Sequence, residues 1–241
     1  MRTQSYMHKR IGLSALISVA AMFVASSTMS SIIPFAHADN INPGVYSIDS
    51  RPYGISYPEW TAKWEQWLIS MPQQINAATD PTGKYCSQNQ NGPIWFLAGT
   101  AGGSAERTCT VPATKAILFP IVNSECSYLD TPTAKSISDL VACAKQDPNR
   151  AINLQVTLDG RNFQQLDKYR VTSPPFNATF IPNNIFGYHA ASTQVVVDGF
   201  YVLLQPLSSG KHELHFSGLT PPASAGGSPF IVDVKYHLTV Q

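Results

Sequence analysis

Histidine is the side chain best suited to acid–base or metal chemistry near neutral pH, and the chain contains six. Four of them follow the N-terminal segment, namely His189, His212, His215 and His237. The sequence contains no H-E-x-x-H, no G-x-S-x-G and no phosphate-binding G-x-x-x-x-G-K-[ST] motif. We therefore predict no catalytic residue, no cofactor and no metal ligand from local motifs. A pair of carboxylates brought together by the fold stays open, because such a pair leaves no spacing in the sequence.

Two of these histidines lie on "KHELHF", whose alternation is typical of a strand with one buried face. His212 shares the apolar face with Leu214 and Phe216, whereas His215 shares the polar face with Glu213. We interpret His212 as a hydrogen-bonded histidine at the edge of the core rather than as a ligand.

The cysteines are the other chemically distinctive side chains: Cys86, Cys109, Cys126 and Cys143. They form no C-x₂₋₄-C pair, which argues against a zinc site. In an exported chain four cysteines are expected to form two disulfides, for which three connectivities exist. Sequential pairing, Cys86–Cys109 and Cys126–Cys143, closes two local loops, each worth roughly 3 kcal/mol on the chain-entropy model. We predict these two bonds. The glycine-rich "GTAGGSAERTC" before Cys109 lacks Gly-Lys-Ser/Thr, so we interpret it as a flexible connection.

The N-terminus has the order of a secretory signal peptide. The basic residues of "MRTQSYMHKR" precede an apolar run from Ile11 to Val24, and a stretch of small residues ends with Ala36 and Ala38. We predict cleavage after Ala38. An uncleaved membrane anchor is the alternative, because the longer stretch Ile11–Met29 approaches the roughly 20 residues that a spanning helix needs. The protein is therefore expected to be secreted or to lie in the cell envelope.

Charge and length limit the classes of function. The formal net charge is +1 and the chain has no lysine- and arginine-rich stripe, so no nucleic-acid partner is expected. The chain beyond residue 38 is long enough to bury one substantial core. We predict residues 1–38 as the signal peptide, 39–55 as an N-terminal extension and 56–241 as one disulfide-containing domain. The membrane is a partner only if the signal segment is kept.

Three of the four tryptophans lie in "SYPEWTAKWEQWLIS", Ser56–Ser70. Ser56 and Glu59 form a capping box, which predicts the start of a helix. At about 100° per residue, the three tryptophans fall with other large apolar side chains in one narrow stripe, and Glu65 lies outside it. The stripe comprises Tyr57, Trp60, Trp64, Trp67, Leu68 and Met71. We predict that it is buried against a sheet, with an exposed aromatic binding platform as the alternative.

The rest of the chain is predominantly strand and loop. Apolar runs at Pro93–Gly99 and Thr114–Asn123 are predicted as buried strands, with an edge or a bulge at Pro120. Residues Ser136–Gln146 are predicted as a second short helix. Beyond it, Ile152–Leu158 alternates like a half-buried strand.

The C-terminal third carries further strand signals. Asp198-Gly199 lies between two apolar runs and is interpreted as a hairpin turn. Phe230–Val240 alternates strictly between apolar and polar residues. Many short strands separated by turn residues indicate an antiparallel, jelly-roll-like β-sandwich, with both helices packed outside it.

Segments 211–217 and 230–240 are consecutive and amphipathic, so we predict that they pair antiparallel. Inward residues must oppose inward residues, so the numbers of directly opposed residues must sum to an even value. A sum of 448 places Glu213 opposite Lys235 and His215 opposite Asp233, whereas a sum of 446 opposes like charges. We predict the register of 448, and we expect the loop Gly218–Ser228 to offer a binding surface.

Several blocks resemble a family of secreted bacterial and archaeal proteins of unknown function. They are "YPEWTAKWEQW", the cysteine-containing block from Asp80 to Cys126, "DGFYVLLQPLSSGKHELHFSG" and the final "YHLTV". The resemblance implies export and a single domain, and it implies no activity and no catalytic residue.

Two main classes of function follow from the sequence. The sandwich pattern, the many aromatic residues and the missing catalytic motifs favour a non-catalytic exported binding module, whose partner is a glycan, an envelope component or another protein. The alternatives are an exported glycosidase-like hydrolase with a carboxylate pair that leaves no motif, and a purely structural envelope protein.

Overall fold

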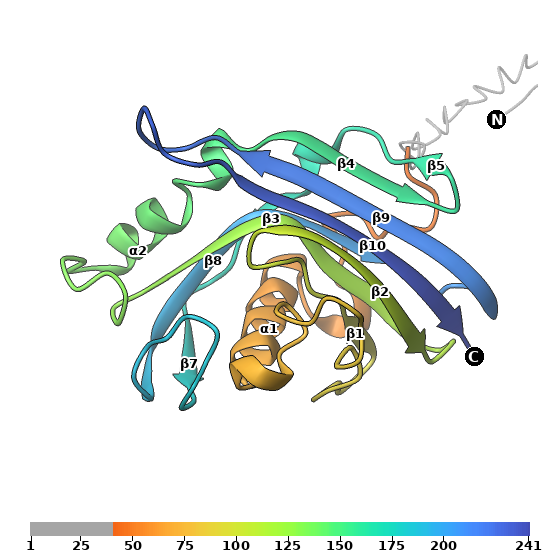
Figure 1. Cartoon of the computed structure of the whole chain (residues 1–241), viewed down its shortest axis with the longest axis horizontal. Helices are drawn as coiled ribbons and strands as arrows, with labels where there is room; N and C mark the ends of the chain where they lie inside the picture. Colours follow the sequence, from red (N-terminus) through yellow and green to blue (C-terminus); the bar gives the residue numbers. More distant parts are fainter. Residues whose placement is uncertain (1–40) are drawn as a thin grey trace, which may run out of the picture. The chain divides into compact units, whose positions relative to one another are not determined.

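The computed structural model describes residues 41–241, whose strands form two five-stranded sheets (Figure 1). The first sheet contains, in spatial order, β1 (Ile94–Phe96), β3 (Ala116–Ser127), β8 (Ala191–Leu204) and β6 (Arg170–Thr172), with β7 (Phe176–Phe180) also paired with β8. The second contains β2 (Gly103–Val111), β10 (Phe230–Val240), β9 (Gly210–Thr220), β4 (Ile152–Leu158) and β5 (Arg161–Asn162). The predicted β-sandwich is confirmed. Each sheet is mixed rather than purely antiparallel, because the pairs β1–β3 and β2–β10 are parallel.

Two α-helices and four short 3₁₀ helices also occur in the described residues. They are α1 (Tyr57–Ile69), α2 (Ile137–Ala144) and four short 3₁₀ helices at Pro52–Gly54, Gln73–Ile75, Pro148–Arg150 and Leu166–Tyr169. The predicted signal peptide and its cleavage after Ala38 lie outside the described residues. The described part of the predicted N-terminal extension, residues 41–55, packs on the first sheet, where Val45 pairs with Leu204 and is 1% exposed.

The first sheet is the middle of three layers. On one face, Phe119 of β3 stacks on Phe216 of β9, with ring centroids 4.7 Å apart. On the other face, Tyr201 of β8 meets Trp64 of α1 edge-on at 5.9 Å, and Figure 1 shows α1 on the side of this sheet away from β9 and β10. Since both faces are covered, β3 and β8 are buried along most of their length instead of alternating.

Helix α1 begins at the predicted capping box, where Ser56 and Glu59 exchange hydrogen bonds. Its tryptophans are 4% (Trp60), 2% (Trp64) and 5% (Trp67) exposed. Their indole N–H groups donate to the backbone carbonyls of Pro52, Leu97 and Gln88, respectively. The predicted burial of the tryptophan stripe is confirmed, and these rings do not form an exposed platform.

Both predicted disulfides are present, Cys86–Cys109 and Cys126–Cys143. The second one ties α2 to the end of β3. Helix α2 lies within the predicted range and begins at its own capping box, formed by Ser136 and Asp139. The bulge expected at Pro120 is also found, as a shift in the pairing of β3 with β8 between Pro120 and Val122.

The predicted turn at Asp198-Gly199 is wrong, because β8 runs straight through both residues. Asp198 is 1% exposed and accepts hydrogen bonds from Arg170 at 2.9 Å and Thr172 at 2.6 Å. A Cβ atom on Gly199 would lie 2.6 Å from the Cα atom of Asn123. Asp198 therefore forms a buried ion pair, and Gly199 allows two strands to approach closely. Neither residue reverses the chain.

The predicted loop before Cys109 is largely a strand. Residues from Gly103 onward form β2, which pairs in parallel with β10 along its whole length. Its inward side chains include Arg107, which is 1% exposed and donates hydrogen bonds to the carbonyls of Asp80, Ala98 and Gly99. The partner strand is distant in sequence, so the glycine-rich start of β2 gave no local signal for it.

Strands β9 and β10 pair antiparallel as predicted, but the register sum is 450 and not 448. Glu213 lies opposite His237, and His215 lies opposite Lys235. The expected ion pairs form across the diagonal instead, with His215 Nε2 2.7 Å from Asp233 Oδ1 and Lys235 Nζ 3.8 Å from Glu213 Oε1. Exposed ion pairs contribute little, and here they form across the diagonal, so charge pairing does not select the register.

Candidate functional site

A cavity of about 350 Å³ lies between α1, β3 and the loop that precedes β8. This volume falls in the range of small-molecule sites, roughly 300–1,000 Å³. We call it the acidic pocket, after the three carboxyl groups in its wall. The wall residues that matter for its chemistry are Trp64, Glu65, Glu125, Asp130, Phe186 and Tyr188.

Glu65 enters the wall from α1, directly after Trp64. It is 1% exposed, and neither oxygen of its carboxyl group has a hydrogen-bond partner. Burial raises the pKa of Glu65 from 4.5 to about 8. At neutral pH the carboxyl group is therefore mostly protonated while the pocket is empty.

Glu125 and Asp130 come from the end of β3 and the turn that follows it. Glu125 is half-buried, but its Oε2 atom is inaccessible and has no partner. Burial, and then the negative charges of Glu65 and Asp130, raise the pKa of Glu125 well above its ordinary value. Asp130 is better supported, because its Oδ1 atom accepts hydrogen bonds from Ser127 N at 2.7 Å and from the hydroxyls of Ser127 and Thr131 at 3.0 Å each.

Another part of the wall is aromatic. The rings of Phe186 and Tyr188 stack with centroids 5.5 Å apart, and the Tyr188 hydroxyl donates to Asp130 Oδ2 at 3.5 Å. Burial, and then the charge of Glu125, raise the pKa of Tyr188. No lysine, arginine or histidine lines the pocket in the described part of the chain. The pocket thus combines uncompensated acidity with an apolar surface.

The hydroxyl of Tyr201 is a further buried polar group beside Glu65. It has no hydrogen-bond partner, and Tyr201 is 0% exposed. Burial, and then the charge of Glu65, raise the pKa of Tyr201 well above its ordinary value. This hydroxyl therefore stays protonated and adds no charge to the acidic side of the pocket.

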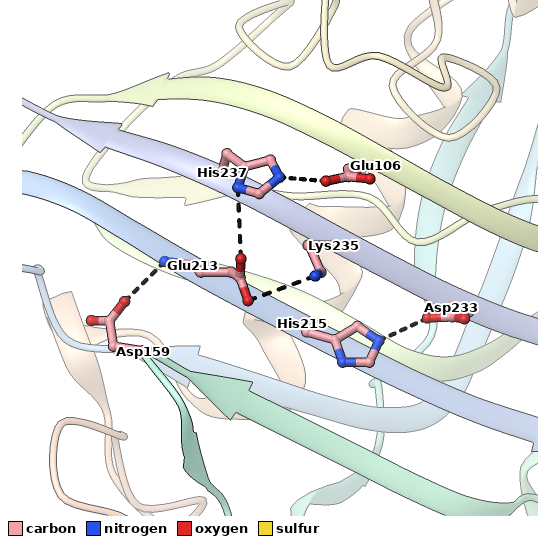
Figure 2. A network of polar contacts seen from close by, with 7 residues as sticks. All are labelled: Glu106, Asp159, Glu213, His215, Asp233, Lys235 and His237. Carbon is pink, nitrogen blue, oxygen red and sulfur yellow. Dashed lines mark hydrogen bonds and ion pairs between the residues drawn. The ribbon is translucent and has the colours of Figure 1, made fainter.

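The histidines of β9 and β10 lie elsewhere: His215 and His237 are on the outer face of the second sheet (Figure 2), and His212 is at the edge of its inward face. His212 Nδ1 lies 2.7 Å from Asp159 Oδ2, and its Nε2 lies 2.9 Å from the Ser208 carbonyl, which confirms a hydrogen-bonded histidine at the core edge. Burial opposes the effect, but these two hydrogen bonds raise the pKa of His212. His237 Nε2 lies 2.6 Å from Glu106 Oε1.

The charged side chains of this outer face form several ion pairs and do not converge on one site. Figure 2 shows Glu213 between His237 and Lys235, while His215 is paired with Asp233. Within residues 41–241, no three side chains of histidine, cysteine, aspartate or glutamate are grouped so that they could hold a metal ion. His189 is exposed in the loop before β8 and belongs to neither region.

The loop expected to form a binding surface, Gly218–Ser228, is shorter than predicted, because β9 continues to Thr220. It borders a separate hollow beside Asp147 and Arg150. None of the loop residues lines the acidic pocket. Of the residues that line this hollow, Phe230, where β10 begins, is the one that also lines the acidic pocket. The binding role of this loop stays a prediction.

No sequence pattern pointed to the carboxyl groups of the pocket. Glu65 was placed outside the apolar stripe of α1, and Glu125 and Asp130 belong to no motif. The sequence leaves open only that the fold could bring two carboxylates together. Their residues could not be named, since they come from segments far apart in the sequence.

Comparisons with known proteins add little. No protein-family model matches the chain, and no curated protein matches it. Among solved structures, a cysteine protease inhibitor from Entamoeba histolytica aligns at 10% identity with a TM-score of 0.22, over 61% of this chain and 94% of the inhibitor. The structure of amebosin aligns at 10% identity with a TM-score of 0.20, over 62% of this chain and 100% of amebosin. Such low scores carry no functional argument. The resemblance to secreted bacterial and archaeal proteins stays a prediction.

Proposed function

We propose that the protein is an extracytoplasmic binding protein that holds a small organic ligand in the acidic pocket. One observation carries the proposal: Glu65 lines the cavity, is 1% exposed and has no hydrogen-bond partner. Buried polar groups in folded proteins are nearly always hydrogen-bonded, and leaving one unpaired costs about 1–3 kcal/mol. A bound ligand that donates hydrogen bonds would supply the missing partners.

The location outside the cytoplasm rests on two features. The N-terminus has the order of a signal peptide, and the described chain carries two disulfides and no free cysteine, as is typical of an oxidising compartment. No helix within residues 41–241 is long and apolar enough to cross a membrane.

A glycan is a poorer fit than a ligand enclosed by the pocket. Surfaces that bind sugars by stacking need exposed aromatic rings. The large apolar side chains exposed in the described part of the chain are Ile41, Tyr53, Ile152, Phe230 and Ile231, with no tryptophan among them. Only two of these five side chains, Tyr53 and Phe230, are aromatic.

A hydrolase is the second candidate, because one cavity holds two carboxyl groups whose pKa values are raised, Glu65 and Glu125. Glycosidases use one protonated acid and a second carboxyl as base or nucleophile. Glu65 would be the acid and Asp130, held by its hydrogen bonds, the second group. Turnover of aryl glycosides by the wild type, lost in Glu65→Gln, would favour this candidate over the binding protein.

The binding proposal is tested by screening the purified protein against amines, alcohols, carboxylates and small sugars, with thermal stabilisation as the readout. Ala101 is exposed and lines the pocket, so Ala101→Trp should obstruct its opening without entering the core. Ala142, exposed on α2, gives the matched control Ala142→Trp. We expect hits that stabilise the wild type and Ala142→Trp but not Ala101→Trp. Hits that stabilise all three proteins equally would contradict the proposal.

A further inference from the structure

We infer that the acidic pocket selects an organic cation, a protonated amine attached to an apolar body, and that it releases a proton when this ligand binds. This inference rests on the proposed function and names the class of its ligand. It does not depend on any enzymatic activity.

The charge of the wall sets the sign of the ligand. Three carboxyl groups line the pocket, and no basic side chain of the described chain lines it with them. An anion would find no positive charge in the wall and would keep Glu65 and Glu125 in their neutral form, close to the carboxylate of Asp130. A cation would instead favour the ionised form of these carboxyl groups and offset the repulsion that opposes their ionisation.

The hydrogen-bonding capacity of the wall matches an ammonium group. Three carboxyl oxygens are buried without partners, namely Glu65 Oε1, Glu65 Oε2 and Glu125 Oε2. An alkylammonium group has three N–H donors and no acceptor, whereas a hydroxyl group has one donor. A charged donor also makes the stronger hydrogen bond to a carboxylate.

The rest of the wall fits an organic body rather than a bare metal ion. Calcium takes about six to eight oxygen ligands, and in the described chain no three acidic, histidine or cysteine side chains are grouped to hold a metal ion. Trp64, Phe186 and Phe230 give the pocket an aromatic lining, against which an alkyl or aryl group would be buried. Aromatic faces also attract cations.

The proton release follows from the state of Glu65 in the empty protein. Burial raises the pKa of Glu65 to about 8, so near neutral pH the pocket holds a carboxylic acid. When an ammonium ion enters, the carboxyl O–H bond breaks, the carboxylate stays beside the ammonium, and the proton passes to solvent. The charge on the ligand is unchanged. Affinity should therefore increase by up to about tenfold per pH unit between roughly pH 5 and pH 8 for one released proton.

The test uses hexylamine as the probe, with hexan-1-ol and hexanoate as the neutral and anionic compounds of matched length. Calorimetry gives the affinities, and a pH indicator in unbuffered solution counts the protons released. We expect hexylamine to bind at least about tenfold more tightly than either matched compound, with close to one proton released per molecule bound near pH 7. In Glu65→Gln the affinity should fall about tenfold or more and the proton release should disappear, whereas Asp167→Asn, at an exposed carboxyl, should behave as the wild type.

Several results would overturn the inference. Hexan-1-ol or hexanoate binding as tightly as hexylamine, with binding lost in Ala101→Trp, would reject the cation while leaving the pocket as the ligand site. Hexylamine binding without proton release, or equally to Glu65→Gln, would reject the role of Glu65. Stabilisation by calcium ions alone, lost in Glu65→Gln, would replace the amine with a metal. Only the absence of any hit that depends on Ala101 would reject the pocket itself.

Discussion

The buried carboxyl of Glu65 should make the protein less stable as the pH rises from weak acid toward neutrality. Its pKa is about 8 in the folded protein against an ordinary value of 4.5, so the folded state holds a proton that the unfolded state loses. Because the folded state binds more protons in this interval, the free energy of unfolding falls as pH rises from about 4.5 to about 8 and then levels off. At about 1.4 kcal/mol per pH unit, Glu65 alone should remove about 2–3 kcal/mol of stability between roughly pH 5 and pH 7.

The perturbation that isolates this effect is Glu65→Gln, which keeps the shape of the side chain and removes its titration. Near pH 5 the variant should match the wild type closely, since both carry an uncharged group. Near pH 7 it should be the more stable protein by about 2–3 kcal/mol. Denaturant unfolding followed by tryptophan fluorescence measures the difference, with Asp167→Asn as an exposed control. A difference between variant and wild type that stays constant with pH would refute the reasoning.

The remaining predictions concern the scaffold of the pocket. Trp64→Ala should destabilise the protein by about 3–5 kcal/mol, because the ring is 2% exposed between the sheet and the pocket, whereas Lys63→Ala on the exposed face should have little effect; an unchanged melting temperature for Trp64→Ala would contradict the packing. Replacing both Cys126 and Cys143 with serine should cost roughly 3 kcal/mol, and non-reducing peptide maps that link Cys109 to Cys126 would exclude the pairing on which this rests. Gly199→Ala should cost about 1–3 kcal/mol because the new Cβ meets Asn123 at 2.6 Å, while Gly99→Ala, which meets only Val232 at 3.4 Å, is the control; equal melting temperatures would show that β3 and β8 are not this close.

Local patterns predicted the elements that local chemistry controls. The capping box at Ser56, the tryptophan stripe and the two short disulfide loops each depend on residues close in sequence, and all are present in the fold. The bulge at Pro120 follows from a missing backbone donor, which is equally local.

The errors arose where distant strands decide the structure. Asp198-Gly199 is a common turn sequence, but here Asp198 pairs with Arg170 and Gly199 allows β3 to approach. The register of β9 and β10 was predicted from exposed charges, but these charges form their ion pairs across the diagonal in the observed register and so do not specify it.

Glu65 shows why the pocket could not be predicted. It lies about 60° around α1 from Leu68, just beyond the apolar stripe. If only one flat sheet covered the helix, Glu65 would be exposed to solvent. Here Ile69, on the same flank of the helix, packs against Phe180 and Val195, so α1 is buried over a wider sector than its periodicity indicates.

The acidic pocket is proposed as the ligand site, and Glu65 as the group that selects an amine. The most direct measurement is an NMR titration of the protein with hexylamine, observing the indole N–H of Trp64 and the backbone amides of Glu65, Glu125 and Tyr188. We expect saturable shifts confined to these residues and their neighbours, which are lost in Glu65→Gln. Shifts centred on the outer face of the second sheet, around His215 and His237, or shifts that persist unchanged in Glu65→Gln, would contradict this proposal.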